Sequence, residues 1–499
     1  MPNLRFAPRF TCLLLLPAFL AVAGEHHLII MHTNDMHASF IPHEATWISS
    51  TPRPMIGGMV RLQEAVDSIR ATGVPTLLLD AGDVMTGNPI AEMEYRGAFG
   101  GALFEMMNRI GYEVWCPGNH DLDISQANLR GLTEIARFPT VCANLVNDKG
   151  EYPVNNKPFV VLQQGGLRIG VIGLISQELY DLVSQKSLTG LKVLAPDETA
   201  QRFIDELRPK VDLIVLLTHE GADEDKTLAK GVRGADVIVG GHSHTRLRAP
   251  LLVNGVRIVQ AGSNCENLGV LEITFADNNP VAYSGQLVSL WTSGERAAGS
   301  VKPFADSMQQ QIDRNFSEVI GTLSENMPRE TSGNPLVAYV SEAQREAAYA
   351  EIGFMNIHGA RKDLTAGKIT KRDLFEVLPF RNVLVTFQLT GAELDSILRY
   401  YVQKHPAIVV TGIAARWKTG KNGDVELREE RVGGKPLEQQ RSYICAASDF
   451  LVGEAEKYLG MRITKTSVSE TTVYDAVEGV IRKEGTMKRK PGMQLERVK

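Results

Sequence analysis

The sequence predicts a layered α/β fold, and two features of its first half support this prediction. Short apolar runs rich in Val, Ile and Leu, each ending at Gly, Asn, Asp or Ser, recur between residues 27 and 275. Segments with helical hydrophobic periodicity, such as residues 57–72 and 197–210, separate these runs. Strands that are buried on both faces and alternate with helices are typical of α/β layered domains.

The predicted elements fall into two parts of the chain. In the first part we expect strands at 27–33, 74–83, 112–119, 167–174, 211–221, 235–243 and 256–263. The polar residues 305–318 then indicate an exposed helix, which suits a connector between domains better than a core element. In the second part we expect strands at 382–390, 407–413 and 441–448, and helices at 335–350 and 391–404.

The composition is that of a large globular protein. A length of 499 residues with 43% hydrophobic content is sufficient for two domains. The net charge of −5 is scattered along the chain and does not favour a nucleic-acid partner. Four cysteines lie beyond the first few dozen residues, and their spacing leaves open whether they pair or remain buried thiols: Cys116, Cys142, Cys265 and Cys445.

The first residues have the layout of a secretory signal. Arg5 and Arg9 precede an uncharged apolar stretch, residues 10–24, that contains the small-x-small pattern of Ala21 and Ala23. We expect a signal peptide over residues 1–23, and hence a secreted or periplasmic protein without stable membrane insertion. The alternative is an uncleaved anchor. The anchor is disfavoured because Pro17 interrupts a continuous helix. It is also disfavoured because a membrane span needs roughly 20 apolar residues, more than this stretch provides.

Polar residues of a particular kind follow the predicted strands of the first part. Since sites form at the carboxyl ends of strands in open α/β sheets, we expect them to converge. Asp, His and Asn suit Mn, Zn, Fe, Co or Ni rather than a thiolate zinc site, and an Asp can bridge two cations. Any one of these residues alone would more simply be a cap or a core residue. In chain order they are Asp35, His37, Asp83, Asn119, His120, Asp121, Asp123, His219, His242 and His244.

The order of these segments resembles the calcineurin-like metallophosphoesterases, in which D-x-H, G-D, G-N-H-D, H and G-H-x-H follow one another. The resemblance implies a four-layer α/β sandwich with two metal sites. One site would be formed by Asp35, His37, Asp83 and His244. The other would be formed by Asp83, Asn119, His219 and His242.

The resemblance gives His120 and Asp123 a catalytic role instead of a metal-binding one. His120 would face the phosphate, and Asp123 would orient its ring. Asp121 is expected to cap a turn or helix start. A metal-bound hydroxide would attack phosphorus in line with the departing alkoxide, without a covalent phospho-enzyme.

The second part resembles the C-terminal domain of the 5′-nucleotidases. The family shows Asn, several Gly and Arg, then G-x-I-T, L-P-F-x-N and L-T-G. Here these are Asn356, Gly359, Arg361 and residues 367–370, 378–382 and 389–391. The resemblance implies that Asn356 and Arg361 contact the substrate, with Arg329 as a second phosphate contact.

This part departs from the family in three places. Ile357 and His358 replace glycines between the Asn and the Arg. The family stacks the nucleobase between two aromatic rings; Phe450 supplies one here, whereas Ala407 aligns with the other. The segment after Phe450 also differs, at residues 454–458. Base preference is therefore expected to be altered, because one base–aromatic stack contributes about 1–3 kcal/mol.

Together these features predict a secreted enzyme that uses two divalent ions (Mn, Zn, Co or Ni) to convert nucleoside 5′-monophosphates to nucleoside and phosphate. We expect a signal peptide (1–23), a metallophosphoesterase domain (24–300), a linker helix (301–319) and a smaller α/β substrate-binding domain (320–499). A nucleotide-sugar pyrophosphatase or a 2′,3′-cyclic-nucleotide phosphodiesterase would use the same site. An inactive nucleotide- or metal-binding receptor is the alternative from a different class.

Overall fold

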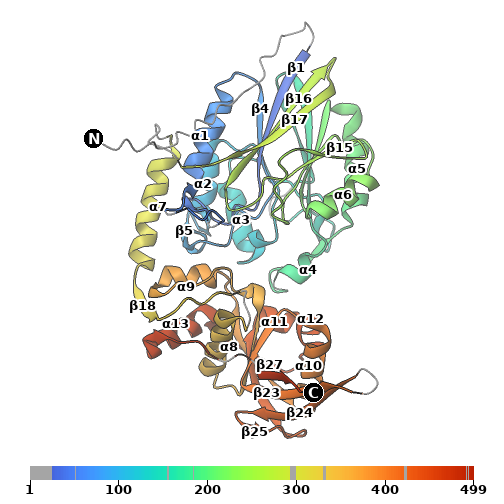
Figure 1. The fold of residues 1–499 in the computed structure, drawn as a ribbon. Coiled ribbons are helices and arrows are strands. Elements are labelled where there is room, and N and C mark those ends of the chain that lie inside the picture. The colour runs from blue at the N-terminus through green and yellow to red at the C-terminus, as the bar shows by residue number, and fades with distance from the viewer. Residues whose placement is uncertain are drawn as a thin grey trace, which may run out of the picture.

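A computed structural model describes residues 25–499 except 46, 51, 154–156, 184, 293–298, 330–332, 421–423, 491, 493 and 499. The predicted signal peptide lies outside the described residues. Figure 1 shows an N-terminal unit and a smaller C-terminal unit, with helix α7 (Val301–Phe316) running along the side of the first toward the second. Within the described residues no helix is long and apolar enough to cross a membrane.

Two sheets form the centre of the N-terminal unit. The first contains, in spatial order, β17 (Asn279–Ser289), β16 (Asn267–Ala276), β1 (Glu25–Thr33), β4 (Thr76–Asp80) and β7 (Val114–Trp115). The second contains β14 (Leu251–Val253), β15 (Val256–Val259), β13 (Val237–Val239), β12 (Leu213–His219), β10 (Leu167–Ile175) and β9 (Phe159–Gln164). Strands β1, β4 and β7 run parallel, as do β10, β12, β13 and β15. Their carboxyl ends therefore share one edge of each sheet.

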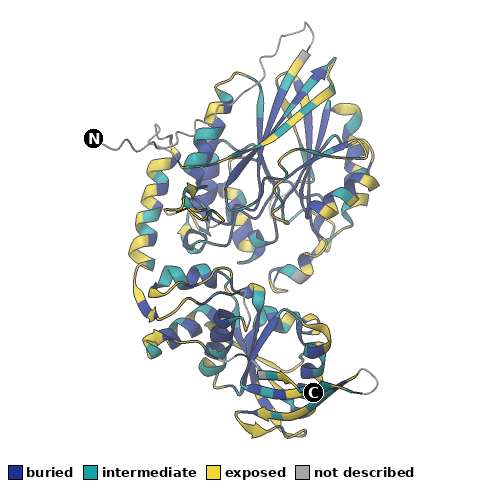
Figure 2. Cartoon of the chain, viewed as in Figure 1, coloured by how far each residue is buried: buried dark blue, intermediate teal, exposed yellow. Residues whose placement is uncertain are grey.

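The two sheets pack face to face through a shared apolar core that includes Leu28, Leu79, Val215 and Val239. Helices α1 (Met59–Arg70), α2 (Gly101–Ile110) and α3 (Gln126–Ile135) share a core with the outer face of the first sheet. Helices α5 (Pro196–Leu207) and α6 (Ala222–Gly231) share one with the outer face of the second. Figure 2 shows the buried residues concentrated in these strands and inward helix faces. The predicted four-layer α/β fold is confirmed.

Short elements complete this unit and lie in the connections between the longer strands and helices. The strands are β2 (His43–Glu44), β3 (Met55–Ile56), β5 (Glu94–Tyr95), β6 (Ala98–Phe99), β8 (Leu145–Asn147) and β11 (Leu191–Val193). The helical turns are η1 (Pro89–Glu92), η2 (His120–Leu122), α4 (Leu179–Leu182) and η3 (Arg208–Lys210).

Helix α7 corrects one expectation from the sequence. A helix was expected at 305–318 and is present, but the expectation that it is exposed is wrong for one face. Val301, Ala305, Met308 and Ile312 are buried in the same core as α1 and α2. Their spacing of three or four residues forms an apolar stripe that the polar residues between them obscure. The helix is therefore anchored on the N-terminal unit.

The C-terminal unit contains three sheets. Their spatial orders are β20-β18-β28, β22-β19-β26-β21-β27 and β25-β24-β23-β29. The strands are β18 (Val319–Leu323), β19 (Ile352–Asn356), β20 (Gly367–Thr370), β21 (Val383–Thr390), β22 (Ile408–Thr411), β23 (Ile413–Thr419), β24 (Val425–Val432), β25 (Lys435–Pro436), β26 (Ser442–Ser448), β27 (Thr466–Thr472), β28 (Thr486–Met487) and β29 (Gln494–Arg497).

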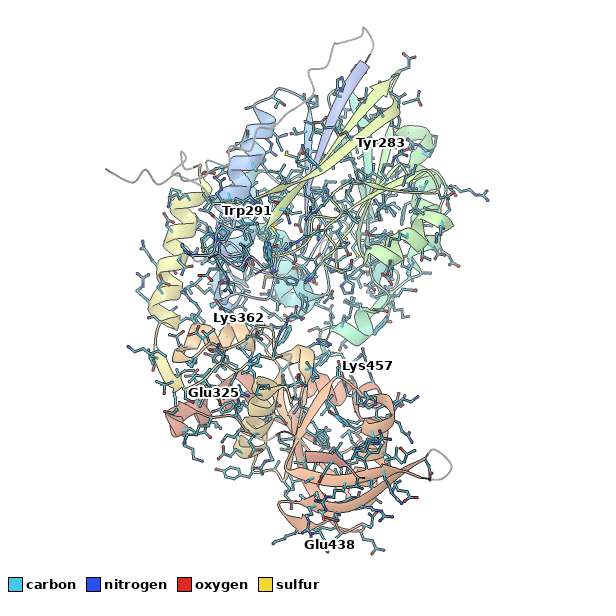
Figure 3. The ribbon with its side chains drawn as sticks, viewed as in Figure 1. Tyr283, Trp291, Glu325, Lys362, Glu438 and Lys457 are labelled. Carbon is cyan, nitrogen blue, oxygen red and sulfur yellow. The ribbon has the colours of Figure 1, made fainter. Side chains whose placement is uncertain are left out.

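The helical elements of this unit are α8 (Pro335–Ala347), η4 (Ile357–Gly359), α9 (Lys371–Val377), α10 (Gly391–Lys404), α11 (Asp449–Gly453), α12 (Ala455–Leu459) and α13 (Val473–Glu484). Capping boxes start α9, from Thr370 to Asp373, and α10, from Thr390 to Glu393. Among the residues labelled in Figure 3, Lys362 and Lys457 lie on the side of this unit that faces the N-terminal unit.

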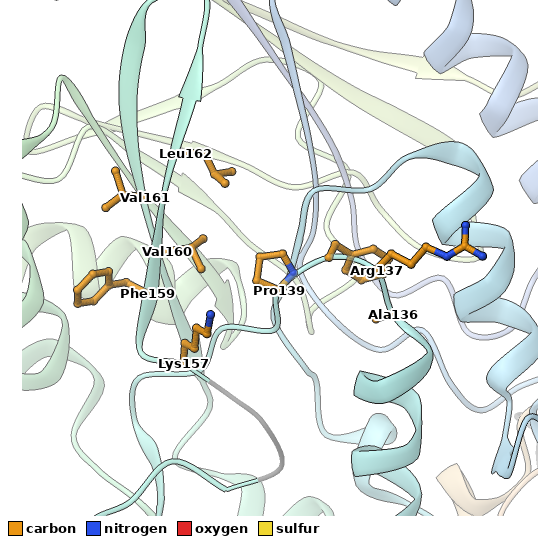
Figure 4. Close-up of a pocket in the computed structure, with 9 residues that line it drawn as sticks. Ala136, Arg137, Pro139, Lys157, Phe159, Val160, Val161 and Leu162 are labelled. Atoms are coloured by element: carbon orange, nitrogen blue, oxygen red, sulfur yellow. The ribbon is translucent and has the colours of Figure 1, made fainter.

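A hollow on the surface is lined by none of the polar residues at the strand ends. It has a volume of about 600 Å³ and lies beside the edge strand β9 (Figure 4). Its lining is mostly aliphatic, with Arg137 and Lys157 as its charged side chains and no carboxylate or imidazole. These groups do not form a catalytic site.

Candidate metal centre

Two groups of metal-binding side chains lie at the carboxyl edge of the two sheets. In each group the possible ligand atoms lie within 4.8 Å of one another: Asp35, His37 and His244 in one, Asp83, His219 and His242 in the other. They come from the loops after β1, β4, β12 and β13, so both sheets contribute. The structure therefore brings together six of the seven metal ligands expected from the sequence.

Asn119, the seventh expected ligand, joins the second group. Its Oδ1 lies 3.2 Å from His219 Nε2 and 3.0 Å from His242 Nδ1. Asp83 Oδ2 lies 3.2 Å from the same His219 Nε2. In the first group His37 Nε2 and His244 Nε2 are 3.0 Å apart. Ring nitrogens and side-chain oxygens thus point at common centres, a donor set that fits divalent transition metals.

The ligand loops hold an unusual backbone conformation. Asp35, His37, Asp83, His242 and His244 all have φ between 46° and 76°, which non-glycine residues rarely adopt. Residues held in sparsely populated regions cost about 1–3 kcal/mol each and concentrate at functional sites. Hydrogen bonds between the loops offset this cost: Asp35 N donates to Gly82 O, and His37 N donates to Asp83 O at 2.9 Å.

Asp121 ties two of the loops together, as its expected capping role predicts. Its buried carboxylate accepts backbone N–H groups of Asp83, Val84, Met85 and Gly118, at 2.8–3.1 Å. Gly118 leaves no room for a side chain, because a Cβ there would lie 2.2 Å from Asp83 Oδ1. The position of the Asp83 carboxylate is therefore fixed from two sides.

Burial keeps the outer imidazoles neutral. It lowers the pKa of His242 and of His244 to about 4, so their ring nitrogens have lone pairs near neutral pH. His219 differs: burial opposes its charge, but Asp83, Asp35 and the Ala81 carbonyl together outweigh burial and raise its pKa to about 10. His219 Nδ1 lies 2.6 Å from the Ala81 carbonyl oxygen, to which it donates; this leaves Nε2 facing Asp83. The group formed by Asp83, His219 and His242 thus stabilises a positive charge next to the Asp83 carboxylate.

His120 lies beside both groups but is held differently. Its Nδ1 lies 2.8 Å from Asp123 Oδ2, and its backbone N donates to Asp83 Oδ1 at 2.8 Å. Thr86 Oγ1 donates to the same Asp123 oxygen at 2.7 Å. Burial opposes charge on the ring, but Asp123 and Asp83 together raise its pKa to about 9. His120 is therefore a protonated imidazole at neutral pH, with Nε2 free of the Asp123 contact.

The C-terminal unit contributes a ring and a guanidinium to the same place. The Phe380 ring stacks on His120 with centroids 5.8 Å apart and planes at 27°. The Arg361 guanidinium carbon lies 5.6 Å from the Phe380 centroid. Arg329 lies near Arg361 and donates to Ala360 O at 3.1 Å. Two cationic side chains thus lie together near the metal-binding groups.

Phe380 lies at the candidate site but was not among the predicted site residues. The available signal is its place in the L-P-F-x-N segment. Of the predicted substrate contacts, Asn356 is buried, and its Oδ1 lacks a hydrogen-bond partner in the described parts of the chain. Phe450 packs on the C-terminal core, with its ring centroid 6.4 Å from that of Tyr458. Ala407 accepts a hydrogen bond from Ile357 N.

Comparison with known proteins gives two family matches. The model of the calcineurin-like phosphoesterases matches residues 28–246, and that of the 5′-nucleotidase C-terminal domain matches residues 319–461. Protein UshA of Yersinia enterocolitica is 26% identical over 498 residues, covering 86% of each chain. A 5′-nucleotidase of Vibrio cholerae is 26% identical over 490 residues, covering 87% of this chain and 86% of the relative.

Among solved structures, a 5′-nucleotidase precursor from Thermus thermophilus superposes with a TM-score of 0.78 at 26% identity. It covers 95% of this chain and 99% of its own. A 5′-nucleotidase from Staphylococcus aureus, described as putative, has a TM-score of 0.74 at 16% identity and covers 95% of this chain and 100% of its own. The second likeness concerns the fold alone.

Proposed function

We propose that this chain, which belongs to the family that joins a calcineurin-like phosphoesterase domain to a 5′-nucleotidase C-terminal domain, hydrolyses nucleoside 5′-monophosphates to nucleoside and phosphate. The chain is a metal-dependent phosphoric-ester hydrolase. One observation carries the substrate proposal: Arg361 and Phe380 of the C-terminal unit lie beside His120 and the two metal-binding groups.

In this proposal seven side chains would hold two divalent ions, of which Mn, Zn, Co and Ni fit the donors. Asp35, His37 and His244 would hold one ion, Asn119, His219 and His242 would hold the other, and Asp83 would take part in both sites. Such a pair of ions would supply Lewis acidity, which polarises the phosphoryl group and lowers the pKa of a water molecule toward neutrality.

His120 and Asp123 provide the acid function. Because the pKa of His120 is about 9, its Nε2 can donate a hydrogen bond or a proton to a phosphoryl or leaving-group oxygen at neutral pH. Asp123 holds the Nδ1 side of the ring at 2.8 Å and so fixes the direction in which Nε2 points. No side chain is needed as a nucleophile, so we expect no covalent phospho-enzyme.

The C-terminal unit selects the substrate in this proposal. Arg361 and Arg329 bind phosphate oxygens through their planar guanidinium groups, and Asn356 offers an amide to the substrate. Phe450 contacts the nucleobase. The Phe380 ring, which faces His120, is a further aromatic contact for the nucleoside.

The proposed domain boundaries separate the catalytic part of the chain from the substrate-binding part. Residues 24–300 form the phosphoesterase domain, 301–319 the linker and 320–499 the substrate-binding domain. We further propose that residues 1–23 direct secretion to the periplasm or the medium and are removed. N-terminal sequencing of the secreted protein tests this, and a mature chain that retains Met1 would contradict it.

The test of the function is a substrate panel combined with metal analysis. Protein loaded with Mn or Co is assayed with AMP and the other nucleoside monophosphates, a nucleotide sugar and a 2′,3′-cyclic nucleotide. Release of phosphate from monophosphates at the highest kcat/KM, with two bound ions per chain by mass spectrometry, supports the proposal. Resistance of AMP alongside rapid turnover of the diphosphate or cyclic substrate would overturn it. Absence of all turnover would favour a binding receptor.

A further inference from the structure

An ion pair crosses between the two units next to the candidate site. Arg381 directly follows Phe380 in the loop between α9 and β21, and its Nε donates to Glu92 Oε2 at the end of η1. The Arg381 guanidinium carbon also lies 4.2 Å from the centroid of the Phe99 ring in β6. One side chain of the C-terminal unit therefore makes a charged and an aromatic contact with the N-terminal unit.

The environment of Glu92 disfavours a carboxylate that has no cation beside it. Its side chain is only 17% exposed, and burial raises its pKa, with the nearby Asp123 adding to the rise and Arg381 opposing it. A half-buried carboxylate that lies close to another carboxylate is less favourable without a neighbouring cation. Separation of the two units would remove that cation, so the pair favours the docked arrangement.

The contact lies at the place where it can influence the site. Phe380, which stacks on His120, and Arg381, which binds Glu92, are consecutive residues. Arg381 is also the variable residue of the L-P-F-x-N segment, so the pair belongs to this chain and not to the motif. Two units of one chain commonly move relative to each other unless their interface is large and apolar. A single charged contact can then shift the equilibrium between the docked and the separated arrangement.

We propose that Arg381 is a positioning residue: with Glu92 and Phe99 it latches the C-terminal unit in the arrangement that places Arg361 and Phe380 beside His120. The latch sets the affinity for substrates that contact both units and leaves the chemical step to the metal centre. This inference rests on the proposed function for its substrate, but its structural part can be tested without any substrate.

The kinetic test uses Arg381→Gln, Glu92→Arg, Arg381→Glu and the Glu92→Arg/Arg381→Glu double variant. KM for AMP should rise about five-fold in Arg381→Gln with kcat within about two-fold, because the variant loses a half-buried ion pair and a cation–π contact at the docking surface but keeps the metal centre. Each charge reversal alone should raise KM further, and the double variant should recover most of that loss. A double variant no better than the two singles would overturn the latch.

Arg416→Gln is the matched control. Arg416 is similarly exposed and pairs with Glu429 and Glu496 in the sheet β25-β24-β23-β29 of the C-terminal unit. This variant should keep the wild-type KM. An equal rise in KM for Arg416→Gln would show a general effect of surface charge and would contradict a role for Arg381 in docking.

Small-angle X-ray scattering of the substrate-free chain tests the latch independently. Arg381→Gln should increase the radius of gyration at low salt, and high salt should expand the wild type in the same way. Arg381→Gln should hydrolyse bis(p-nitrophenyl) phosphate, a small ester that the metal centre alone can accept, at the wild-type rate. An unchanged radius of gyration in Arg381→Gln would overturn the latch. An increased radius with no AMP hydrolysis by any variant would overturn the proposed substrate and keep the latch.

Discussion

The candidate metal ligands of the N-terminal unit lie at the carboxyl end of a buried strand or on the loop that follows it, whereas the proposed substrate contacts of the C-terminal unit reach the site only because the two units dock. At the metal centre, backbone hydrogen bonds join loop to loop, as from His37 N to Asp83 O. At the docking surface, the contacts include a ring face on His120, a half-buried ion pair and a cation–π contact. Metal binding and substrate binding should therefore be separable by mutation.

The largest effect tests the metal half of this comparison. Asp83→Ala removes the carboxylate that lies beside His219 and accepts the His120 backbone N–H. Activity should fall by more than about 1,000-fold, because loss of one electrostatic group at a reaction centre already costs about 100- to 1,000-fold. Mass spectrometry should find less than the two ions expected per wild-type chain. Full metal content in Asp83→Ala would show that the two groups do not share this residue.

His120→Ala separates catalysis from metal binding within the N-terminal unit. The kcat should fall by about 100- to 10,000-fold, the range for loss of a general acid, while metal content stays that of the wild type. Asp123→Asn is the companion variant: it keeps the shape beside Nδ1 but removes the charge that helps to raise the pKa of His120. It should lose less kcat than His120→Ala. Loss of metal in His120→Ala would mean that the residue is a ligand.

Arg361→Ala tests the docking half. The change should lower kcat/KM for AMP by about 10- to 100-fold, because a hydrogen bond to a charged group contributes about 1.5–3 kcal/mol. Metal content should remain unchanged, since Arg361 approaches from the other unit. Steady-state kinetics with Arg361→Lys alongside measures how much of the effect needs the planar guanidinium. A wild-type kcat/KM in Arg361→Ala would remove the residue from the phosphate site.

The same contrast explains how much could be predicted from the sequence. The α/β class follows from the alternation of buried runs and helices, and parallel strands bring their carboxyl ends to one edge. Residues such as Asp35, Asp83 and His219 could therefore be expected to meet although they lie far apart in the chain. The role of Asp121 followed from its place at a turn. These inferences need only local pattern and sheet geometry.

The missed features depend on packing that no local pattern encodes. Phe380 faces His120 only because the C-terminal unit docks against the N-terminal one, and nothing in residues 378–382 identifies that partner. The pair of Arg381 and Glu92 is of the same kind. Helix α7 was expected to be exposed because its apolar stripe is narrow, and its burial against α1 and α2 depends on the fold of the whole unit. Contacts that depend on how distant elements pack together could therefore not be predicted from the sequence.

The smallest effect should come from the nucleobase contact. Phe450→Leu removes the ring but keeps an apolar side chain, which matters because Phe450 packs on the C-terminal core. If Phe450 stacks on the base, kcat/KM for AMP should fall about ten-fold, in line with about 1–3 kcal/mol per stacked base. Ribose 5-phosphate, which has no base, should be hydrolysed as by the wild type. The measurement is the ratio of the two kcat/KM values.

Phe380→Leu provides the comparison that decides between the two rings. Phe380 lies against His120, so its loss should reduce kcat/KM for AMP and for ribose 5-phosphate together if it contacts the sugar or orients the imidazole. A fall confined to AMP in Phe380→Leu, with Phe450→Leu unchanged, would move the base contact to the docking loop. Base selection would then depend on the same docking that brings Arg361 to the metal centre. In that case selection of the nucleobase, like binding of the phosphate, would require both units.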